Sequence, residues 1–308
     1  MPESIQTIVA LGPVERELVE PLLAPGQRFV PEPDESDLAQ ARAAIVRAAY
    51  TVDGRMLDRM PELKVLARTG VGTERVDVAE AERRGIPVVI TPGSNTSSVA
   101  EGVFTHLLAL VKRLSDLTSL VRHGQWEDRA TVQVGDLEGH TLGIVGYGRI
   151  GRRVERLARA FDLRVLAYDP FAEIPADIRR ESLAQLLQES DFVTLHLPLS
   201  AETHNMFDAA RFSSMRPGSI LVNCSRGGLV DLDAAVSALG SGQLGGLGLD
   251  VYDPEPPAHH PVFDHPRVTL SPHVMGFTQQ SMANTVRDAV LGALAVLDGR
   301  SPVAVAVP

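Results

Sequence analysis

The stretch Leu142-Gly143-Ile144-Val145-Gly146-Tyr147-Gly148-Arg149-Ile150-Gly151 decides the fold of this chain. Its glycines at 146, 148 and 151 form a G-x-G-x-x-G pattern between an apolar segment typical of a strand and a helical pattern over residues 149–161. A second strand pattern, 164–168, follows and ends at Asp169. The glycine pattern alone is weak evidence, but a strand–helix–strand unit that ends in an acidic residue is typical of a dinucleotide-binding site.

Each key position of this unit has its own expected role. Gly146 permits a tight turn, Gly148 lets the backbone approach a pyrophosphate, and Gly151 lets the helix pack closely on the strand. The helix N-terminus offers free N–H groups and a partial positive charge to the phosphates. Asp169 is expected to bind ribose hydroxyls and to repel a 2′-phosphate, and Pro170 follows it rather than an arginine. The sequence therefore predicts NAD rather than NADP as the cofactor.

Composition excludes several classes of function. The net charge of −10 disfavours nucleic acid and anionic membrane surfaces as partners. Cys224 is the only cysteine, so no intrachain disulfide forms, and a reducing compartment, the cytoplasm, is expected. We find no run of about 18 uncharged apolar residues and no signal-peptide pattern, so no membrane partner is expected. Neither of the two lysines follows a glycine loop, which disfavours P-loop ATP chemistry.

Strand and helix patterns alternate almost throughout the chain. This alternation predicts an α/β fold with two doubly wound parallel-sheet domains. Besides the glycine-loop unit, the predicted strands are 5–10, 44–46, 64–68, 88–90, 192–195, 220–223, 247–250 and 268–270. The other predicted helices include 13–23, 54–60, 76–84 and 279–297.

A long helix is predicted between the two groups of strands. Ser98-Val99-Ala100-Glu101 has the S-x-x-E pattern of a capping box, and apolar periodicity continues to about residue 121. One face of the predicted helix carries Val103, Leu107, Leu110, Val111 and Leu114. With the following loop around Trp126, this face exceeds what one cofactor domain covers, which predicts a two-fold homodimer. The alternative is a helix that packs wholly within its own chain.

Candidate catalytic residues follow the later strands. Oxidation of an alcohol by a nicotinamide cofactor requires a base for the hydroxyl proton and a cation for a carboxylate or carbonyl group. Such groups are expected just past the carboxyl ends of parallel strands, where Arg226, Asp250 and His273 lie. Arg226 can clamp a carboxylate with two hydrogen bonds. Glu255, in the loop after Asp250, can orient the imidazole of His273. The alternatives are a surface arginine that caps a turn for Arg226 and solvated loop side chains for Glu255 and His273.

Other reactive side chains receive structural interpretations. His196, at the end of strand 192–195, is interpreted as a structural position. His259, His260 and His265 lack a nearby cysteine and helical spacing, so we expect solvated side chains and no metal site. Cys224 is interpreted as a small packing residue on the rim of the cofactor site.

Together these residues resemble the D-isomer-specific 2-hydroxyacid dehydrogenase family over about residues 64–280, and specifically members without a regulatory C-terminal domain. Within the family, the segment 224–228 looks most like phosphoglycerate dehydrogenases. The matching segments are Arg68-Thr69-Gly70-Val71-Gly72, Ser98-Val99-Ala100-Glu101, Gly143 to Gly151, Val222-Asn223-Cys224-Ser225-Arg226-Gly227-Gly228, Leu249-Asp250-Val251 with Glu255-Pro256, and Ser271-Pro272-His273.

The resemblance implies a Rossmann cofactor domain, 98–276, inserted into a flavodoxin-like substrate domain, 1–97 plus 277–308. It implies a catalytic set of Arg226, Glu255 and His273 that serves hydride transfer between NAD(H) and a D-2-hydroxy acid/2-keto acid pair, with 3-phosphoglycerate as a candidate substrate. Glyoxylate or hydroxypyruvate reduction is an alternative, and a non-catalytic NADH-sensing protein that binds partners is another. The implied cofactor contacts are Arg149, Ile150, Leu197, Cys224, Asp250, the segment from His273 to Gly276, and the nearby Thr91.

The resemblance also implies a binding loop for the substrate carboxylate, formed by the backbone N–H groups of Val71 and Gly72. The role of Arg68 stays open. Its guanidinium suits an anionic substituent such as phosphate, but it can equally serve as a structural ion-pair partner at the end of its strand.

Overall fold

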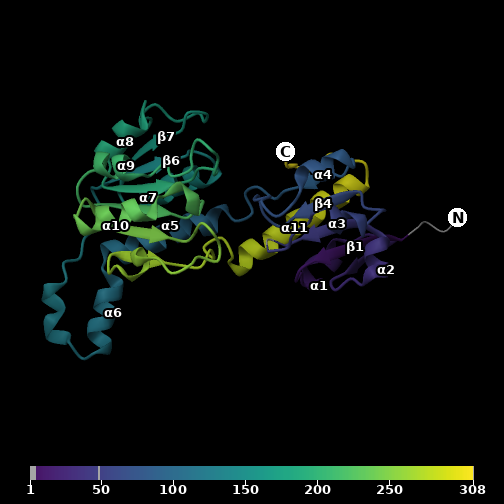
Figure 1. Cartoon of the computed structure of the whole chain (residues 1–308), viewed down its shortest axis with the longest axis horizontal. Coiled ribbons are helices and arrows are strands. Elements are labelled where there is room, and N and C mark those ends of the chain that lie inside the picture. Colours follow the sequence, from purple (N-terminus) through teal and green to yellow (C-terminus); the bar gives the residue numbers. More distant parts are fainter. Residues whose placement is uncertain (1–4, 48, 308) are drawn as a thin grey trace. The chain divides into compact units, whose positions relative to one another are not determined.

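The structure, a computed structural model, describes residues 5–47 and 49–307 and divides into two compact units. The first unit runs to Asn95 and resumes at Phe277, and the second runs from Thr96 to Gly276. The first boundary thus lies at 95/96 rather than at the expected 97/98. Figure 1 shows α11 (Gln279–Leu297), in yellow, beside the strands of the N-terminal segment. No described helix has the length and apolar character needed to cross a membrane.

The first unit is built on a five-stranded parallel sheet in the order β2-β1-β3-β4-β5. This is the order of flavodoxin-like folds. Helices α1 and α11 bury apolar residues on one face of the sheet, and α2, α3 and α4 do so on the other. The elements are β1 (Gln6–Leu11), α1 (Arg16–Val19), β2 (Gln27–Val30), α2 (Glu35–Ala39), β3 (Ala41–Val46), α3 (Gly54–Asp58), β4 (Val65–Arg68), α4 (Val78–Arg83) and β5 (Val88–Val89).

The sequence missed two elements of this unit and overextended a third. β2 is a polar edge strand in which only Phe29 is buried, so it carries almost no alternation signal. α2 is a single short turn of helix capped by Asp34. The helix predicted over 13–23 is wrong as one element, because α1 ends at Val19 and a 3₁₀ turn, Glu20–Leu22, contains Pro21.

The second unit contains a six-stranded parallel sheet in the order β11-β10-β9-β8-β6-β7. The chain leaves β6 toward β7 on one side and returns to β8 on the other. The strand order therefore switches direction between β6 and β8, which is where ligands bind in doubly wound sheets. The bounds of β7, β8 and β11 match the predicted strands residue for residue. The strands are β6 (Thr141–Val145), β7 (Arg164–Tyr168), β8 (Phe192–Leu195), β9 (Ser219–Asn223), β10 (Leu244–Leu249) and β11 (Val268–Leu270).

Helices cover both faces of this second sheet. One core cluster joins it to α5 and α7, and another joins it to α8, α9 and α10. The helices are α5 (Thr96–Val111), α6 (Leu114–Arg122), α7 (Arg149–Ala160), α8 (Leu183–Glu189), α9 (Ala209–Ser214) and α10 (Leu232–Gly240). The predicted fold class of two doubly wound α/β units is confirmed.

The long helix predicted from Ser98 to about residue 121 is two helices. Arg113, with a positive φ of 53°, separates α5 from α6. α5 begins at Thr96, so Ser98 lies inside the helix and the predicted capping box is wrong. Leu114 is 58% exposed instead of sharing the buried face of α5. α6 has no buried residue, and Figure 1 shows it extending away from the sheet of its unit.

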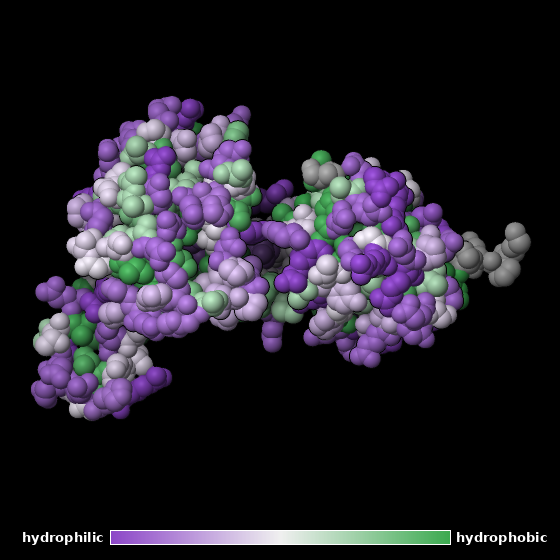
Figure 2. Space-filling view, viewed as in Figure 1, coloured by the Kyte–Doolittle hydropathy of each residue, from purple (hydrophilic) through white to green (hydrophobic). Residues whose placement is uncertain are grey.

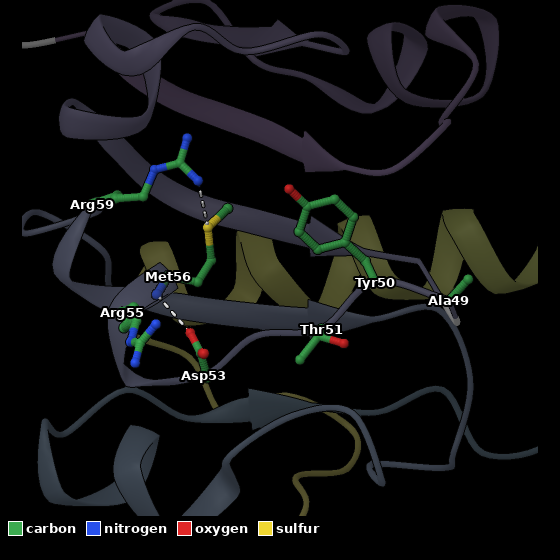
Figure 3. Close-up of a pocket in the computed structure, with 7 residues that line it drawn as sticks. All are labelled: Ala49, Tyr50, Thr51, Asp53, Arg55, Met56 and Arg59. Carbon is green, nitrogen blue, oxygen red and sulfur yellow. Dashed lines mark hydrogen bonds between the residues drawn. The ribbon is translucent and has the colours of Figure 1, made fainter.

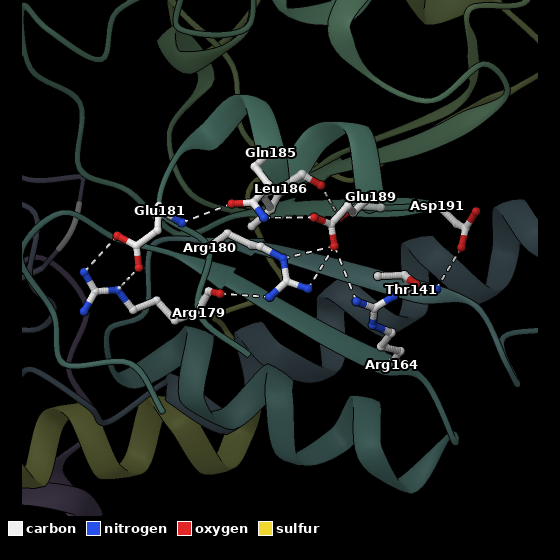
Figure 4. A network of polar contacts seen from close by, with 10 residues as sticks. Thr141, Arg164, Arg179, Arg180, Glu181, Gln185, Leu186, Glu189 and Asp191 are labelled. Atoms are coloured by element: carbon white, nitrogen blue, oxygen red, sulfur yellow. Dashed lines mark hydrogen bonds and ion pairs between the residues drawn. The ribbon is translucent and has the colours of Figure 1, made fainter. Parts of the chain in front are cut away.

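A polar network on the surface of the second unit ties α8 to neighbouring strands (Figure 4). Glu189, at the end of α8, accepts hydrogen bonds from Arg180 and from Arg164, the first residue of β7. The bonds from Arg180 lower the pKa of the Glu189 carboxyl. Asp191 accepts a hydrogen bond from the backbone N–H of Thr141, which joins the starts of β8 and β6. The contact to Thr141 lies at the start of β6, the strand that leads into the glycine loop.

Candidate active site

The glycine loop between β6 and α7 leaves room for an anion. Gly146 has a positive φ of 95°, and a Cβ there would lie 2.5 Å from the carbonyl oxygen of His196. A Cβ on Gly151 would lie 2.3 Å from the carbonyl oxygen of Gly146, so glycine is needed for the close approach of α7. A Cβ on Gly148 would meet no atom within 4 Å, and no side chain caps α7 at this exposed residue. The open cradle and the uncapped N–H groups of α7 fit a phosphate group.

Asp169 holds this loop in place, a role that the sequence did not reveal. One oxygen accepts from the backbone N–H of Tyr147 at 2.8 Å. The other accepts from Phe171 at 2.8 Å and Ala172 at 3.1 Å. A carboxylate offers about four lone-pair positions, so one position on the first oxygen remains for a ribose hydroxyl. The expected ribose contact stays a prediction.

His273 and Glu255 form a hydrogen-bonded pair, with 2.7 Å between His273 Nδ1 and Glu255 Oε2. His273 lies three residues past β11 with a positive φ of 54°, and Glu255 lies in the loop after β10. The other Glu255 oxygen accepts from the backbone N–H of Tyr252 at 3.0 Å. Both side chains are partly exposed and line a cavity of about 360 Å³, whose other walls are mostly apolar. The pair is therefore anchored and accessible.

Arg226 follows β9 in a turn that contacts the loop of Glu255. Its carbonyl oxygen accepts from the side-chain amide of Asn223 at 2.8 Å, and its Nη1 donates to the carbonyl of Ser225 at 2.9 Å. A Cβ on Gly227 would lie 2.0 Å from the carbonyl carbon of Tyr252. This glycine lets the Arg226 turn lie directly against the residue whose N–H holds Glu255. The structure thus brings together the loops of the three predicted catalytic residues.

Asp250, the implied nicotinamide contact, is only 2% exposed. Its carboxylate accepts from the hydroxyl of Ser271 at 2.6 Å and from the backbone N–H groups of Val274 at 2.9 Å and Met275 at 3.1 Å. Asp250 therefore shapes the segment from His273 to Gly276. The other implied cofactor residues lie nearby in the fold of this unit, because Leu197 follows β8, Cys224 follows β9, and Arg149 and Ile150 begin α7.

In the first unit, Arg68 shapes the proposed substrate loop. Its side chain is buried and donates from Nε to the carbonyl of Gly72 at 2.8 Å. The Thr91 hydroxyl accepts from the backbone N–H of Gly70 at 2.8 Å. Val71, between Gly70 and Gly72 in the chain, is 50% exposed. These bonds give Arg68 and Thr91 a structural role in the loop, whatever else they bind.

Arg47 and Arg75 are candidate residues that the sequence did not single out. The burial of Arg68 lowers its pKa, and the charges of Arg47 and Arg75 lower it further, against the opposing effect of Glu74. Three guanidinium groups therefore lie near this loop. The sequence could have indicated Arg47 as a candidate, because it directly follows β3. The preceding residue, Val46, pairs with Arg68 on the neighbouring β4.

Cys224, His259 and His260 have surroundings that do not suggest a catalytic or metal-binding role. Burial raises the pKa of the Cys224 thiol, and the charge of Asp250 adds to this effect, so the thiol stays protonated at neutral pH. His259 contacts Asp264 at 3.1 Å, and His260 contacts Asp233 at 3.3 Å. Among the described residues, no group of three or more histidine, cysteine or acidic side chains is placed to hold a metal ion.

His196 is the most strongly perturbed histidine that the structure describes. Part of the residue is accessible, but its Nδ1 is enclosed and has no hydrogen-bond partner among the described residues. Nε2 lies 3.2 Å from the Thr194 hydroxyl. Desolvation lowers the pKa of this imidazole to about 3.

We therefore expect His196 to make the protein less stable in acid. An unfolded histidine binds a proton below about pH 6.5, whereas folded His196 excludes it down to about 3. The unfolding free energy should fall by up to about 1.4 kcal/mol per pH unit across that window. Urea unfolding of His196→Asn, compared at neutral and mildly acid pH, should show a shallower loss. His204→Asn, at an exposed histidine, is the control, and an equal change in both variants would contradict the assignment.

A second cavity, of about 410 Å³, lies in the first unit (Figure 3). Its polar wall is occupied by structural contacts: Asp53 caps α3 through the backbone N–H of Met56, and Arg59 bonds to Met56 Sδ and pairs with Glu35. It contains none of the residues that the sequence singled out.

Comparison with known proteins identifies the family. The family described as "D-isomer specific 2-hydroxyacid dehydrogenase, NAD binding domain" matches residues 104–275. The chain belongs to this family. The match confirms the resemblance seen in the motifs, and it establishes the second unit as an NAD-binding domain of that family, which confirms the predicted cofactor.

Two curated relatives and one solved structure illustrate the similarity. A glyoxylate reductase from Thermococcus litoralis is 35% identical over 273 residues, which cover 84% of this chain and 82% of the relative. A D-3-phosphoglycerate dehydrogenase from Synechocystis sp. is 35% identical over 81% of this chain, but this chain spans only about half, 47%, of that relative. The TT0316 protein from Thermus thermophilus has a TM-score of 0.87 at 34% identity, and the match covers 98% of this chain and 100% of that protein.

Proposed function

We propose that this member of the family interconverts a D-2-hydroxy acid and its 2-keto acid with NAD(H). The observation that carries the proposal is the 2.7 Å contact between His273 and Glu255 beside the Arg226 turn. A base, an oriented acid partner and a cation on adjacent loops are the groups that this reaction requires. The glyoxylate reductase and phosphoglycerate dehydrogenase relatives support the same reaction class.

The second unit supplies the groups that would hold the cofactor. The phosphates fit the cradle at Gly148 and the N-terminus of α7, and the open acceptor position of Asp169 fits a ribose hydroxyl. The open acceptor position of Asp250 fits a carboxamide N–H. When bound, NAD supplies the acceptor or donor of the hydride.

His273 and Glu255 manage the proton. During oxidation, Nε2 of His273 takes the hydroxyl proton of the substrate, and during reduction it returns that proton to the keto oxygen. Nδ1 keeps its hydrogen throughout and donates it to Glu255, so the negative carboxylate stabilises the imidazolium that forms. The Tyr252 N–H holds the other Glu255 oxygen and keeps the pair aligned.

Arg226, Val71 and Gly72 would bind the substrate. Arg226 carries a planar guanidinium with paired N–H donors, and its Nη1 donates to the Ser225 carbonyl, which helps to orient the group. A guanidinium of this geometry suits a carboxylate, which it can clamp with two parallel hydrogen bonds while it polarises the adjacent carbonyl. The backbone N–H groups of Val71 and Gly72 offer a second site for the carboxylate, and nearby Arg47 and Arg75 favour an anionic substrate.

A substrate panel tests the proposal. NADH consumption is measured with glyoxylate, hydroxypyruvate, pyruvate and 3-phosphohydroxypyruvate, which separates the phosphoglycerate hypothesis from the glyoxylate/hydroxypyruvate alternative. Arg68→Ala is run on the same panel: a selective loss for the phosphorylated substrate shows that Arg68 binds phosphate, and an equal loss assigns it to the loop. Tight NADH binding with no turnover of any 2-keto acid would overturn the proposal and favour a non-catalytic, NADH-sensing function.

Asp169 should set the preference between cofactors. Its carboxylate repels a 2′-phosphate, so we expect higher kcat/KM with NADH than with NADPH. Asp169→Asn keeps acceptor capacity for part of the loop while removing the charge, and should reduce this preference by about tenfold or more. Asp177→Asn, at an exposed acid after β7, is the matched control. Equal use of both cofactors by the unmodified protein would contradict the prediction.

We also propose a homodimer formed through residues 114–134, an arm that contains α6 and the 3₁₀ helix Trp126–Thr131. This arm exposes Leu114, Val121, Trp126 and Val134, each more than half accessible. Figure 2 shows hydrophobic surface on the arm. An apolar surface of this kind favours a self-complementary two-fold interface. Light scattering at micromolar concentration should give twice the mass of one chain. The double variant Val121→Glu, Trp126→Glu should give the mass of a single chain. A single-chain mass for the unmodified protein would refute the dimer.

A further inference from the structure

Helix α5 carries a buried histidine to which the proposed mechanism assigns no role. His106 is 3% exposed. Its Nδ1 lies 2.8 Å from the Thr269 hydroxyl in β11, and its Nε2 lies 3.0 Å from the Ser271 hydroxyl. Thr269 lies four residues before His273 in the chain, and Ser271 lies two residues before it. The imidazole thus bridges a helix and the end of the strand that presents the proposed base.

The hydrogen positions in this bridge follow from its far end. Ser271 Oγ lies 2.6 Å from Asp250 Oδ1, and because a carboxylate has no proton to give, Ser271 donates. Its single hydrogen is then used, so Ser271 accepts the hydrogen of His106 Nε2. His106 Nδ1 carries no hydrogen and accepts from Thr269. Burial lowers the pKa of His106 against the opposing charge of Asp250, which agrees with a neutral imidazole.

A series of hydrogen bonds therefore runs from Thr269 through His106 and Ser271 to Asp250, the final acceptor. Asp250 in turn accepts the backbone N–H groups of Val274 and Met275, which directly follow His273. Ser271 and Val274 are thereby tied to one carboxylate on either side of the proposed base. His273 itself has a left-handed backbone conformation, which these flanking bonds help to maintain.

Two glycines let α5 pack closely, Gly102 against the segment from His273 to Gly276 and Gly248 in β10 against His106. A Cβ on Gly102 would lie 2.4 Å from Met275 Cβ, and a Cβ on Gly248 would lie 2.7 Å from His106 Cβ. The helix therefore contacts the segment at two places, once through Met275 and once through the His106 bridge.

We propose that His106 is a positioning residue, which acts through Ser271 and Asp250 to place His273 for proton transfer and Asp250 for the nicotinamide. The inference rests on the proposed function. Without the imidazole, the Ser271 hydroxyl loses its donor and can turn away from Asp250, and the segment from His273 to Gly276 loosens. Misplacement of a reacting group by about 1 Å can cost about a hundredfold in rate. Substrate affinity should change little, because Arg226, Val71 and Gly72, which are proposed to bind the substrate, do not take part in this series of hydrogen bonds.

The test compares three single variants. His106→Leu should lower kcat by about ten- to a hundredfold, with the KM for the 2-keto acid within about threefold. His106→Gln, whose amide can still donate to Ser271, should recover most of that loss. Leu107→Val, at the next buried position of α5, is the packing control and should leave kcat unchanged. Equal kcat values for His106→Leu and Leu107→Val would overturn the inference.

A double variant and an exchange measurement sharpen the result. If the effect passes through Ser271, adding His106→Leu to Ser271→Ala should lower kcat by less than about twofold more. Full additivity would overturn the inference. Amide hydrogen exchange at Val274 and Met275 requires no turnover and should accelerate at least about tenfold in His106→Leu. Unchanged exchange would refute the inference even if the substrate panel showed no activity, whereas that panel alone decides the proposed function.

Discussion

We expect His273→Gln to lower kcat for 2-keto-acid reduction by about 10²- to 10⁴-fold, the usual contribution of a positioned acid–base group. Glutamine can still hydrogen-bond to Glu255, but its amide does not titrate near neutral pH and cannot act as a general acid or base. Steady-state rates with the best substrate of the panel measure the loss. NADH binding, followed by fluorescence, should stay within about threefold, because the glycine loop and Asp169 are untouched.

Glu255→Gln separates charge from orientation at the same site. The carboxamide oxygen can still accept from Tyr252 or from His273 Nδ1, so the ring stays near its position. The negative charge that stabilises the imidazolium is lost, and we expect kcat to fall by a smaller factor, about 10- to 100-fold. Rates within twofold of the unmodified protein in both variants would remove His273 and Glu255 from the mechanism.

The second large effect is expected at Arg226. Lysine keeps the positive charge but presents no planar pair of N–H donors, so it cannot clamp a carboxylate with two parallel hydrogen bonds. We expect Arg226→Lys to lower kcat/KM by about a hundredfold, which corresponds to about 2.7 kcal/mol of transition-state stabilisation. Most of the change should appear for every 2-keto acid of the panel, because the carboxylate and the carbonyl are common to all of them.

Arg216→Lys is the matched control for this substitution. Arg216 lies on the same unit but forms a partly exposed ion pair with Asp191. Exposed pairs of this kind contribute little, so kcat/KM should not change. If Arg226→Lys behaved like Arg216→Lys, Arg226 would not be the cation of the proposed mechanism.

Local pattern was enough to locate much of the chain's framework. The bounds of β7, β8, β11 and α11 agree with the predicted ranges because each is a continuous apolar or periodic segment with a clear break at both ends. The glycine loop could also be predicted, because its turn and close packing depend on residues only a few positions apart. Arg226, Glu255 and His273 could be named because they follow strands, and parallel strands end at one edge of a sheet.

Elements whose stability comes from distant partners were not visible in the same way. β2 forms by pairing with β1 and has only one buried side chain, so its own residues carry little signal. The end of α5 depends on the left-handed conformation of a single arginine, Arg113, and arginine is an ordinary helix former. Helical periodicity across residues 96–122 therefore concealed the break.

The sequence by itself determined the fold class, the glycine loop, the family and the identity of the proposed catalytic residues, because these depend on residue type and short spacing. Only the tertiary structure decided which hydrogen bonds keep the glycine loop and the proposed catalytic residues in position. Asp169 and Asp250 proved to be acceptors for backbone N–H groups, and His106 reached Ser271 across 165 positions of the chain. A hydrogen bond requires atoms within about 3 Å in a defined direction, and no local pattern of residues specifies which distant side chains the packing of helix on sheet will bring to that distance.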